Sequence, residues 1–140
     1  MKRSASTTLS SEPKHLKLSQ SAFWNHMATL TSELAQVCQH REALEQRISK
    51  IKRLVRVPVE KDWILYCCTW WKMIMLYHDS PEKQEKIKAF TTLTKQTPNN
   101  LEHLYDILID INGQKHNMDI QYMQRLTDMD KMYEYAKKKL

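Results

Sequence analysis

The chain has 140 residues, about one domain, and its 41% hydrophobic and 27% charged residues are typical of a folded protein rather than a disordered one. It contains one glycine, Gly113. Phosphate-binding loops, dinucleotide fingerprints and nucleophile elbows each need more than one glycine, because the backbone must approach a ligand closely or turn sharply. These enzyme classes are excluded, and we expect no enzymatic activity, no catalytic residues, no cofactor and no small-molecule substrate.

The three cysteines are Cys38, Cys67 and Cys68. An odd number with two adjacent does not form a disulfide framework and predicts reduced thiols in the cytoplasm or the nucleus. Residues 1–20 lack the apolar core of a secretory signal, and the apolar stretch 63–77 is shorter than the roughly 20 residues that span a membrane. We therefore expect an intracellular protein without membrane contact.

The first two segments are separated by composition and by proline. Residues 1–18 are rich in Ser, Thr and Lys, which predicts a disordered tail. Ser19 is a good N-cap, and no helix breaker follows until Pro58. The sequence therefore predicts one long helical segment over 19–57, whose helix is about 55 Å long at 1.5 Å per residue.

This long helix carries apolar residues at alternating spacings of three and four, the pattern of a coiled-coil seam. Arg41 is the polar member of the series, and it either fixes the register of pairing or extends past the seam on its aliphatic stem. We predict that the seam pairs with another copy or with a different helical chain. Its apolar members are Met27, Leu30, Leu34, Val37, Leu44, Ile48, Ile51 and Val55.

Residues 58–140 are predicted to form a helical bundle region. The helix expected over 59–78 is apolar on nearly every side, which predicts a central position covered by neighbouring helices. Its aromatic residues are the expected core: Trp63, Tyr66, Trp70, Trp71 and Tyr77.

Three further helices are expected over 81–96, 100–111 and 117–139. Ser80 followed by Pro81 starts the first of them, and Asn99 with Glu102 forms a capping box for the second. Gly113 stands where a glycine commonly ends a helix. No alternation of apolar and polar residues predicts a strand. The predicted fold class is all-α: a long N-terminal coiled-coil helix and a small bundle of about four further helices.

The segment 47–56 carries five positive charges and no negative one. Such a patch favours an acidic partner surface, nucleic acid or the cytoskeleton, and the alternative is an ordinary solvated surface. The six histidines have no metal-binding spacing, so no metal site is expected. The residues of the patch are Arg47, Lys50, Lys52, Arg53 and Arg56.

A predicted last helix of about 23 residues, roughly 35 Å, is too short to cover the whole seam, so a partner chain is expected to cover the rest. The alternative is that the first helix breaks near Gln39–Glu42, where the seam is weakest, and folds back into a closed bundle. The sequence thus predicts a non-catalytic helical subunit that pairs with partner chains in a homo- or hetero-oligomer. Such architecture is typical of spindle, kinetochore and chromatin complexes, an analogy that rests on architecture alone. The alternatives are a basic protein that binds nucleic acid through residues 47–56 and a viral or mobile-element structural protein.

Overall fold

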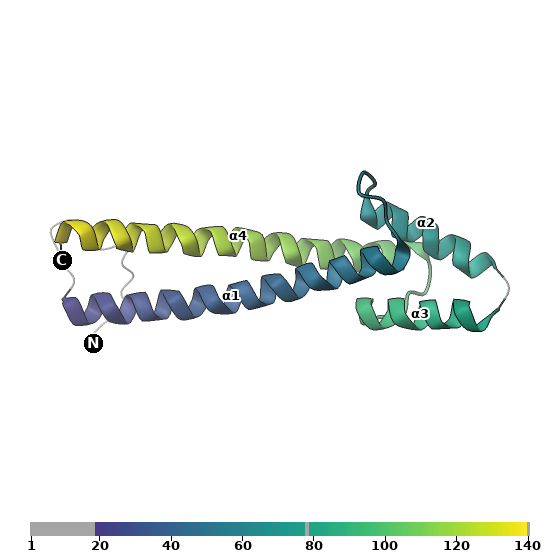
Figure 1. Ribbon diagram of the computed structural model, residues 1–140, viewed down its shortest axis with the longest axis horizontal. Coiled ribbons are helices and arrows are strands. Elements are labelled where there is room, and N and C mark those ends of the chain that lie inside the picture. The colour runs from purple at the N-terminus through teal and green to yellow at the C-terminus, as the bar shows by residue number, and fades with distance from the viewer. Residues whose placement is uncertain (1–18, 78, 140) are drawn as a thin grey trace. The chain divides into compact units, whose positions relative to one another are not determined.

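The computed structural model describes residues 19–77 and 79–139, and in this part of the chain it contains helices and no strands (Figure 1). The helices are α1 (Gln20–Val55), α2 (Trp63–Leu76), α3 (Pro81–Thr94) and α4 (Leu101–Lys139). The all-α fold class and the long N-terminal helix are confirmed. The predicted tail, residues 1–18, lies outside the described residues.

A side-chain cap sets the start of α1, and the backbone conformation sets its end. Ser19 Oγ accepts a hydrogen bond from the Ala22 N–H at 3.0 Å, as expected of an N-cap. The helix ends at Val55 because Arg56 adopts the left-handed conformation, with φ at 62°. The Val57 N–H then donates to the Lys52 carbonyl at 2.9 Å, which is the Schellman arrangement at a helix C-terminus.

The start of α2 differs from its predicted position at residue 59. Residues 58–61 form a turn in which the Lys61 N–H donates to the Pro58 carbonyl at 3.1 Å. Asp62 then caps the helix, since its carboxylate accepts from the backbone N–H groups of Ile64 and Leu65. A proline inside a helix's first turn is acceptable, but here the stronger aspartate cap four residues later defines the start.

The start of α3 is as predicted. Ser80 Oγ accepts from the Lys83 N–H at 3.1 Å, and Pro81 is the first helical residue. The helix ends earlier than expected, at Thr94, because Lys95 takes a left-handed conformation and its N–H donates to the Thr91 carbonyl.

The helices expected over 100–111 and 117–139 are a single helix, so three helices rather than about four follow α1 in the described part of the chain. Gly113 does not terminate α4 and has no positive φ. The N-cap is also displaced by one residue: Asn100 Oδ1 accepts from the His103 N–H at 2.8 Å, and His103 Nδ1 accepts from the Asn99 N–H at 3.0 Å. A glycine that terminates a helix adopts the left-handed backbone conformation. Gly113 does not adopt it, so α4 continues through this position.

Replacing Gly113 by alanine tests the continuity of α4. A methyl group there meets nothing within 4 Å, and alanine favours the helix, so we expect the free energy of unfolding to rise by about 0.5–1 kcal/mol. Denaturant unfolding followed by circular dichroism measures the change. A loss of stability would show that Gly113 adopts the left-handed conformation of a helix end.

The described chain divides into two compact units, and both long helices contribute to each of them. Of the described residues, the first unit comprises 19–35 and 124–139, and the second comprises 36–77 and 79–123. Both sides of the boundary expected at 57/58 lie in the second unit. The first unit has a small core of Phe23, Leu30 and Met132.

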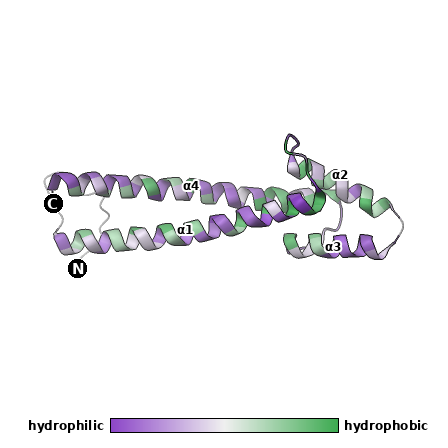
Figure 2. Cartoon of the chain, viewed as in Figure 1, coloured by the Kyte–Doolittle hydropathy of each residue, from purple (hydrophilic) through white to green (hydrophobic). Residues whose placement is uncertain are grey.

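The second unit contains the larger core, to which all four helices contribute. The first half of α3 is mostly hydrophilic (Figure 2), and its second half supplies Phe90, which is fully buried. The ring of Phe90 lies 5.2 Å from that of Trp70 and 5.5 Å from that of Trp71, measured between centroids. The buried residues of this core are Ile48, Ile51, Val55, Ile64, Cys67, Trp71, Phe90, Leu104, Ile107, Leu108 and Ile111.

Candidate partner-binding surface

The apolar seam of α1 is covered within the chain. In the second unit its five members are buried, with exposed fractions from 0 to 8%. In the first unit Leu30 is buried, and Met27 and Leu34 are half-buried. The seam was expected to need a partner because a short last helix could not reach along it. The continuous α4 removes that need, and in this conformation the seam offers little apolar surface to another chain. The members in the second unit are Val37, Leu44, Ile48, Ile51 and Val55.

Arg41, the polar member of the seam, pairs with α4. Its Nε lies 2.6 Å from Asp119 Oδ1, and its guanidinium carbon lies 4.7 Å from the ring centroid of Tyr122. Lys115 also contacts Asp119, at 3.0 Å, and lies 3.9 Å from Glu45 of α1. Of the two interpretations left open, this geometry supports a role in fixing the register, here between α1 and α4.

The way the free energy of unfolding falls at acid pH should depend on Asp119. The hydrogen bond from Arg41, with a further one from Lys115, lowers the pKa of Asp119 below its usual value. A carboxylate with a lower pKa in the folded state stabilises the fold above its unfolded pKa, and the contribution is lost as the pH falls through the folded pKa. Wild type should therefore exceed Asp119→Asn in free energy of unfolding near neutral pH, and the difference should shrink below about pH 4. Urea unfolding across this range measures it, and a difference that grows in acid would contradict the assignment.

The helix expected to be central, α2, has one buried side only. Trp71 is buried, and Trp63, Tyr66 and Trp70 are half-buried against the larger core. Tyr77, predicted as a core residue, lies beyond the end of α2 and is 60% exposed. The prediction was wrong at this position because three neighbouring helices cover one side of α2 and nothing in the described chain covers the other.

Exposed apolar side chains gather at the C-terminal end of α2. We define the apolar end as Met73, Met75, Leu76 and Tyr77, which are 45, 50, 74 and 60% exposed. Single exposed apolar residues are ordinary on a protein surface. Met73, Leu76 and Tyr77 stand at spacings of three and four, which places them on one side of the helix as a patch, and Met75 points to another side. The sequence contained this signal, a helix that is apolar on nearly every side with a polar stripe of Asp62, Thr69 and Lys72 only, but we interpreted it as a central helix covered by its neighbours.

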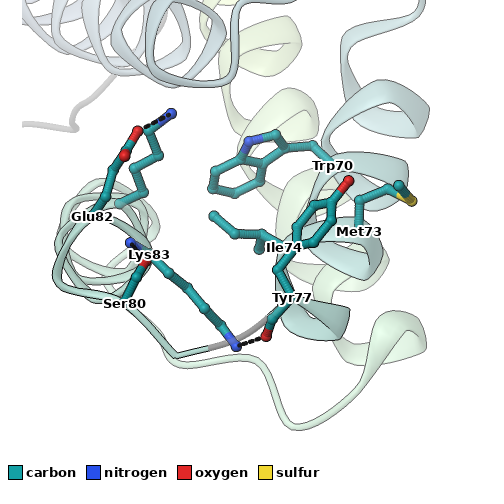
Figure 3. Close-up of a pocket in the computed structure, with 8 residues that line it drawn as sticks. Trp70, Met73, Ile74, Tyr77, Ser80, Glu82 and Lys83 are labelled. Carbon is teal, nitrogen blue, oxygen red and sulfur yellow. Dashed lines mark hydrogen bonds and ion pairs between the residues drawn. The ribbon is translucent and has the colours of Figure 1, made fainter.

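A hollow of about 350 Å³ lies beside the apolar end, between α2 and the start of α3 (Figure 3). Trp70 and Ile74 of α2, and Tyr77 just beyond its end, line one side of the hollow, and Lys83 of α3 lies opposite (Figure 3). The Lys83 ammonium donates to the Tyr77 carbonyl at 3.0 Å and lies 3.3 Å from Asp79, so this cation is held at the rim.

The predicted basic patch does not form one surface. Arg47 is half-buried and caps the end of α3: its Nε donates to the Leu93 carbonyl at 2.6 Å and its guanidinium also donates to the Thr94 carbonyl at 2.9 Å. Burial lowers the pKa of Arg47. Lys50 lines a separate hollow between α1 and α3. The remaining cations are exposed near the turn between α1 and α2: Lys52, Arg53 and Arg56.

Cys67 is buried in the larger core, and Cys68 packs against it. Burial raises the pKa of the Cys67 thiol to about 12 and also raises that of Cys68, so neither forms a thiolate readily near neutral pH. No group of three or more His, Cys, Asp or Glu side chains is placed to hold a metal ion within residues 19–77 and 79–139.

Comparison with family models, with curated proteins and with solved structures finds no match to this chain. None of the helices in the described segments is both long and apolar enough to cross a membrane. The fold and the surfaces above define a helical protein with an internally paired long helix, an exposed apolar end on α2 and a separate cluster of cations. Its function is inferred from these residues.

Proposed function

We propose that this chain is a non-catalytic helical subunit of a protein complex, and that it binds its partner through the apolar end of α2 and the adjoining hollow. The observation that carries the proposal is the clustering of Met73, Met75, Leu76 and Tyr77, between 45 and 74% exposed, beside a 350 Å³ hollow. Contiguous exposed apolar surface is typical of protein–protein interfaces. The seam of α1 was the predicted interface, and the proposal moves the contact to α2.

The chemistry of the surface indicates the kind of segment that it binds. Methionine is flexible and polarizable and adapts to different apolar neighbours. A hollow with apolar walls suits a large aliphatic or aromatic anchor, the type of residue that dominates binding energy. On the α3 side of the hollow, Lys83 is paired with Asp79 and Lys86 with Glu82, so these two cations do not require an acidic partner. The expected partner segment is therefore an apolar stretch that carries a large aliphatic or aromatic anchor.

The type of complex and its location in the cell are proposed from the sequence. We propose a complex of spindle, kinetochore or chromatin type, by architectural analogy, and a cytoplasmic or nuclear location, from the three unpaired cysteines. The alternative of nucleic-acid binding through residues 47–56 has weaker support, because Arg47 is used to cap α3 and Lys50 lies apart from the other cations.

Site-specific photo-crosslinking in cells tests the proposal. A crosslinker at Leu76 should capture a protein partner that the same group at Thr92, an exposed residue of α3, does not capture. With that partner purified, Leu76→Glu should weaken binding by about tenfold or more, since a charge in an apolar contact costs above about 1.4 kcal/mol. Thr92→Glu should bind as wild type does.

Two results would contradict the proposal. One is equal capture at Leu76 and Thr92. The other is a purified complex whose affinity is the same for Leu76→Glu and for wild type. Circular dichroism of each variant shows that the helices are retained, so that lost binding is not lost folding.

A further inference from the structure

A second surface, independent of the apolar end of α2, lies at the turn between α1 and α2. There the end of α1 and the following turn surround an open hollow of about 570 Å³. We call it the basic hollow. Its polar lining comprises Ser49, Lys52, Arg53 and Arg56 from the end of α1, and Lys61 from the turn.

The four cations of the basic hollow have no carboxylate partner. None of the ion pairs formed by the described residues includes Lys52, Arg53, Arg56 or Lys61. Asp62, nearby, is bound to backbone N–H groups at the start of α2, and Glu60 does not line the hollow. Four like charges around one concavity repel each other and concentrate positive potential there, which attracts a multivalent anion.

The backbone at Arg56 adds a separate observation. Its φ of 62° places an arginine in the left-handed conformation that ends α1, a position where glycine is favoured because residues with a Cβ are strained there. Glycine would be more stable there but would remove a cation from the lining of the hollow. Strained residues of this kind concentrate at functional sites.

The extent of the charge indicates a compact ligand rather than a long polyanion. Residues 20–40 of α1 contain no lysine or arginine, so the cations form no track along the helix for an extended nucleic-acid backbone. A volume near 570 Å³ is within the range of small-ligand sites. Lysine ammonium and arginine guanidinium groups are the side chains that bind phosphate.

We propose that the basic hollow binds a compact group of two or more phosphates. The ligand is either a free oligophosphate or the phosphorylated headgroup of a lipid, because the same cations recognise both. Val59 is fully exposed at the rim of the hollow, on the turn that follows Pro58, and an apolar tip beside cations would contact a lipid surface if the source is a headgroup.

Titration calorimetry of the full chain with inorganic tripolyphosphate tests the site. Arg53→Gln and Arg56→Gly should each weaken binding about tenfold, since each removes a charge-assisted hydrogen bond to phosphate, which is stronger than a neutral one. Lys95→Gly is the matched control: it also removes a cation from a left-handed residue at a helix end, with φ at 63°, but lies on α3 outside the hollow. Both glycine variants should melt at higher temperature than wild type, and only Arg56→Gly should lose affinity.

A second arm identifies the source of the phosphate. Sedimentation is measured with phosphatidylcholine vesicles that contain a few per cent of a bisphosphorylated phosphoinositide. Binding that Arg53→Gln and Val59→Ser both weaken assigns a lipid headgroup, and binding of tripolyphosphate without vesicle binding assigns a free ligand. The proposal is overturned if Lys95→Gly weakens tripolyphosphate binding as much as Arg56→Gly does, if wild type binds neither probe, or if a single-stranded oligonucleotide of equal phosphate concentration binds more tightly than tripolyphosphate.

Discussion

Replacing Phe90 by alanine is expected to lower the free energy of unfolding by about 3–5 kcal/mol, a large part of the 5–15 kcal/mol that stabilises a typical domain. Phe90 is fully buried, and its ring contacts those of Trp70 and Trp71. Removing the ring leaves a cavity at the point where α2 and α3 meet, and α3 has no other aromatic residue to compensate. Urea unfolding followed by circular dichroism measures the loss.

Thr92→Ala is the control on the same helix. Thr92 is exposed and its hydroxyl donates only to the Lys88 carbonyl one turn earlier, so the substitution should change stability by about 0.5 kcal/mol or less. If Phe90→Ala costs no more than Thr92→Ala, then α3 does not pack on α2 as described. The hollow beside the apolar end of α2 would then lose its second wall.

A charge in the α1 seam is expected to have a comparable or larger effect. Leu44 is 4% exposed and stands between Arg41 and Glu45, both of which contact α4. Leu44→Asp places a carboxylate in this apolar contact without a partner, which should cost several kcal/mol and unfold a large fraction of the chain. Far-UV circular dichroism and the urea midpoint measure the effect.

Ala43→Asp provides the matched control, since it introduces the same charge one position earlier at an exposed site of the same helix. Its cost should be limited to the lower helix propensity of aspartate, below about 1 kcal/mol. Equal destabilisation by the two substitutions would show that Leu44 is not covered by α4.

The sequence predicted those features that local chemistry determines. Ser19 and Ser80 cap helices where expected, because a serine hydroxyl satisfies backbone N–H groups independently of the rest of the fold. The long α1 followed from the absence of glycine and proline over its length. The core positions of its seam followed from their spacing.

Features that depend on tertiary contacts were not predictable in the same way. Gly113 is compatible with either a helix end or a helix interior, and the continuous α4 depends on its pairing with α1. The sequence of residues 47–56 predicts one basic patch. In the structure, Arg47 donates hydrogen bonds to the carbonyl groups at the end of α3 and is thereby separated from the other cations. The apolar end of α2 was visible as hydrophobicity, whereas its exposure depends on how many helices surround it.

The central claim is that α1 buries its apolar seam against α4 of the same chain. Sedimentation equilibrium of the purified 140-residue chain over a wide concentration range tests it most directly. We expect a monomer of 16.7 kDa whose melting temperature does not change with concentration. A dimer that melts at higher temperature as concentration rises, and that Leu44→Asp converts to folded monomers, would contradict it.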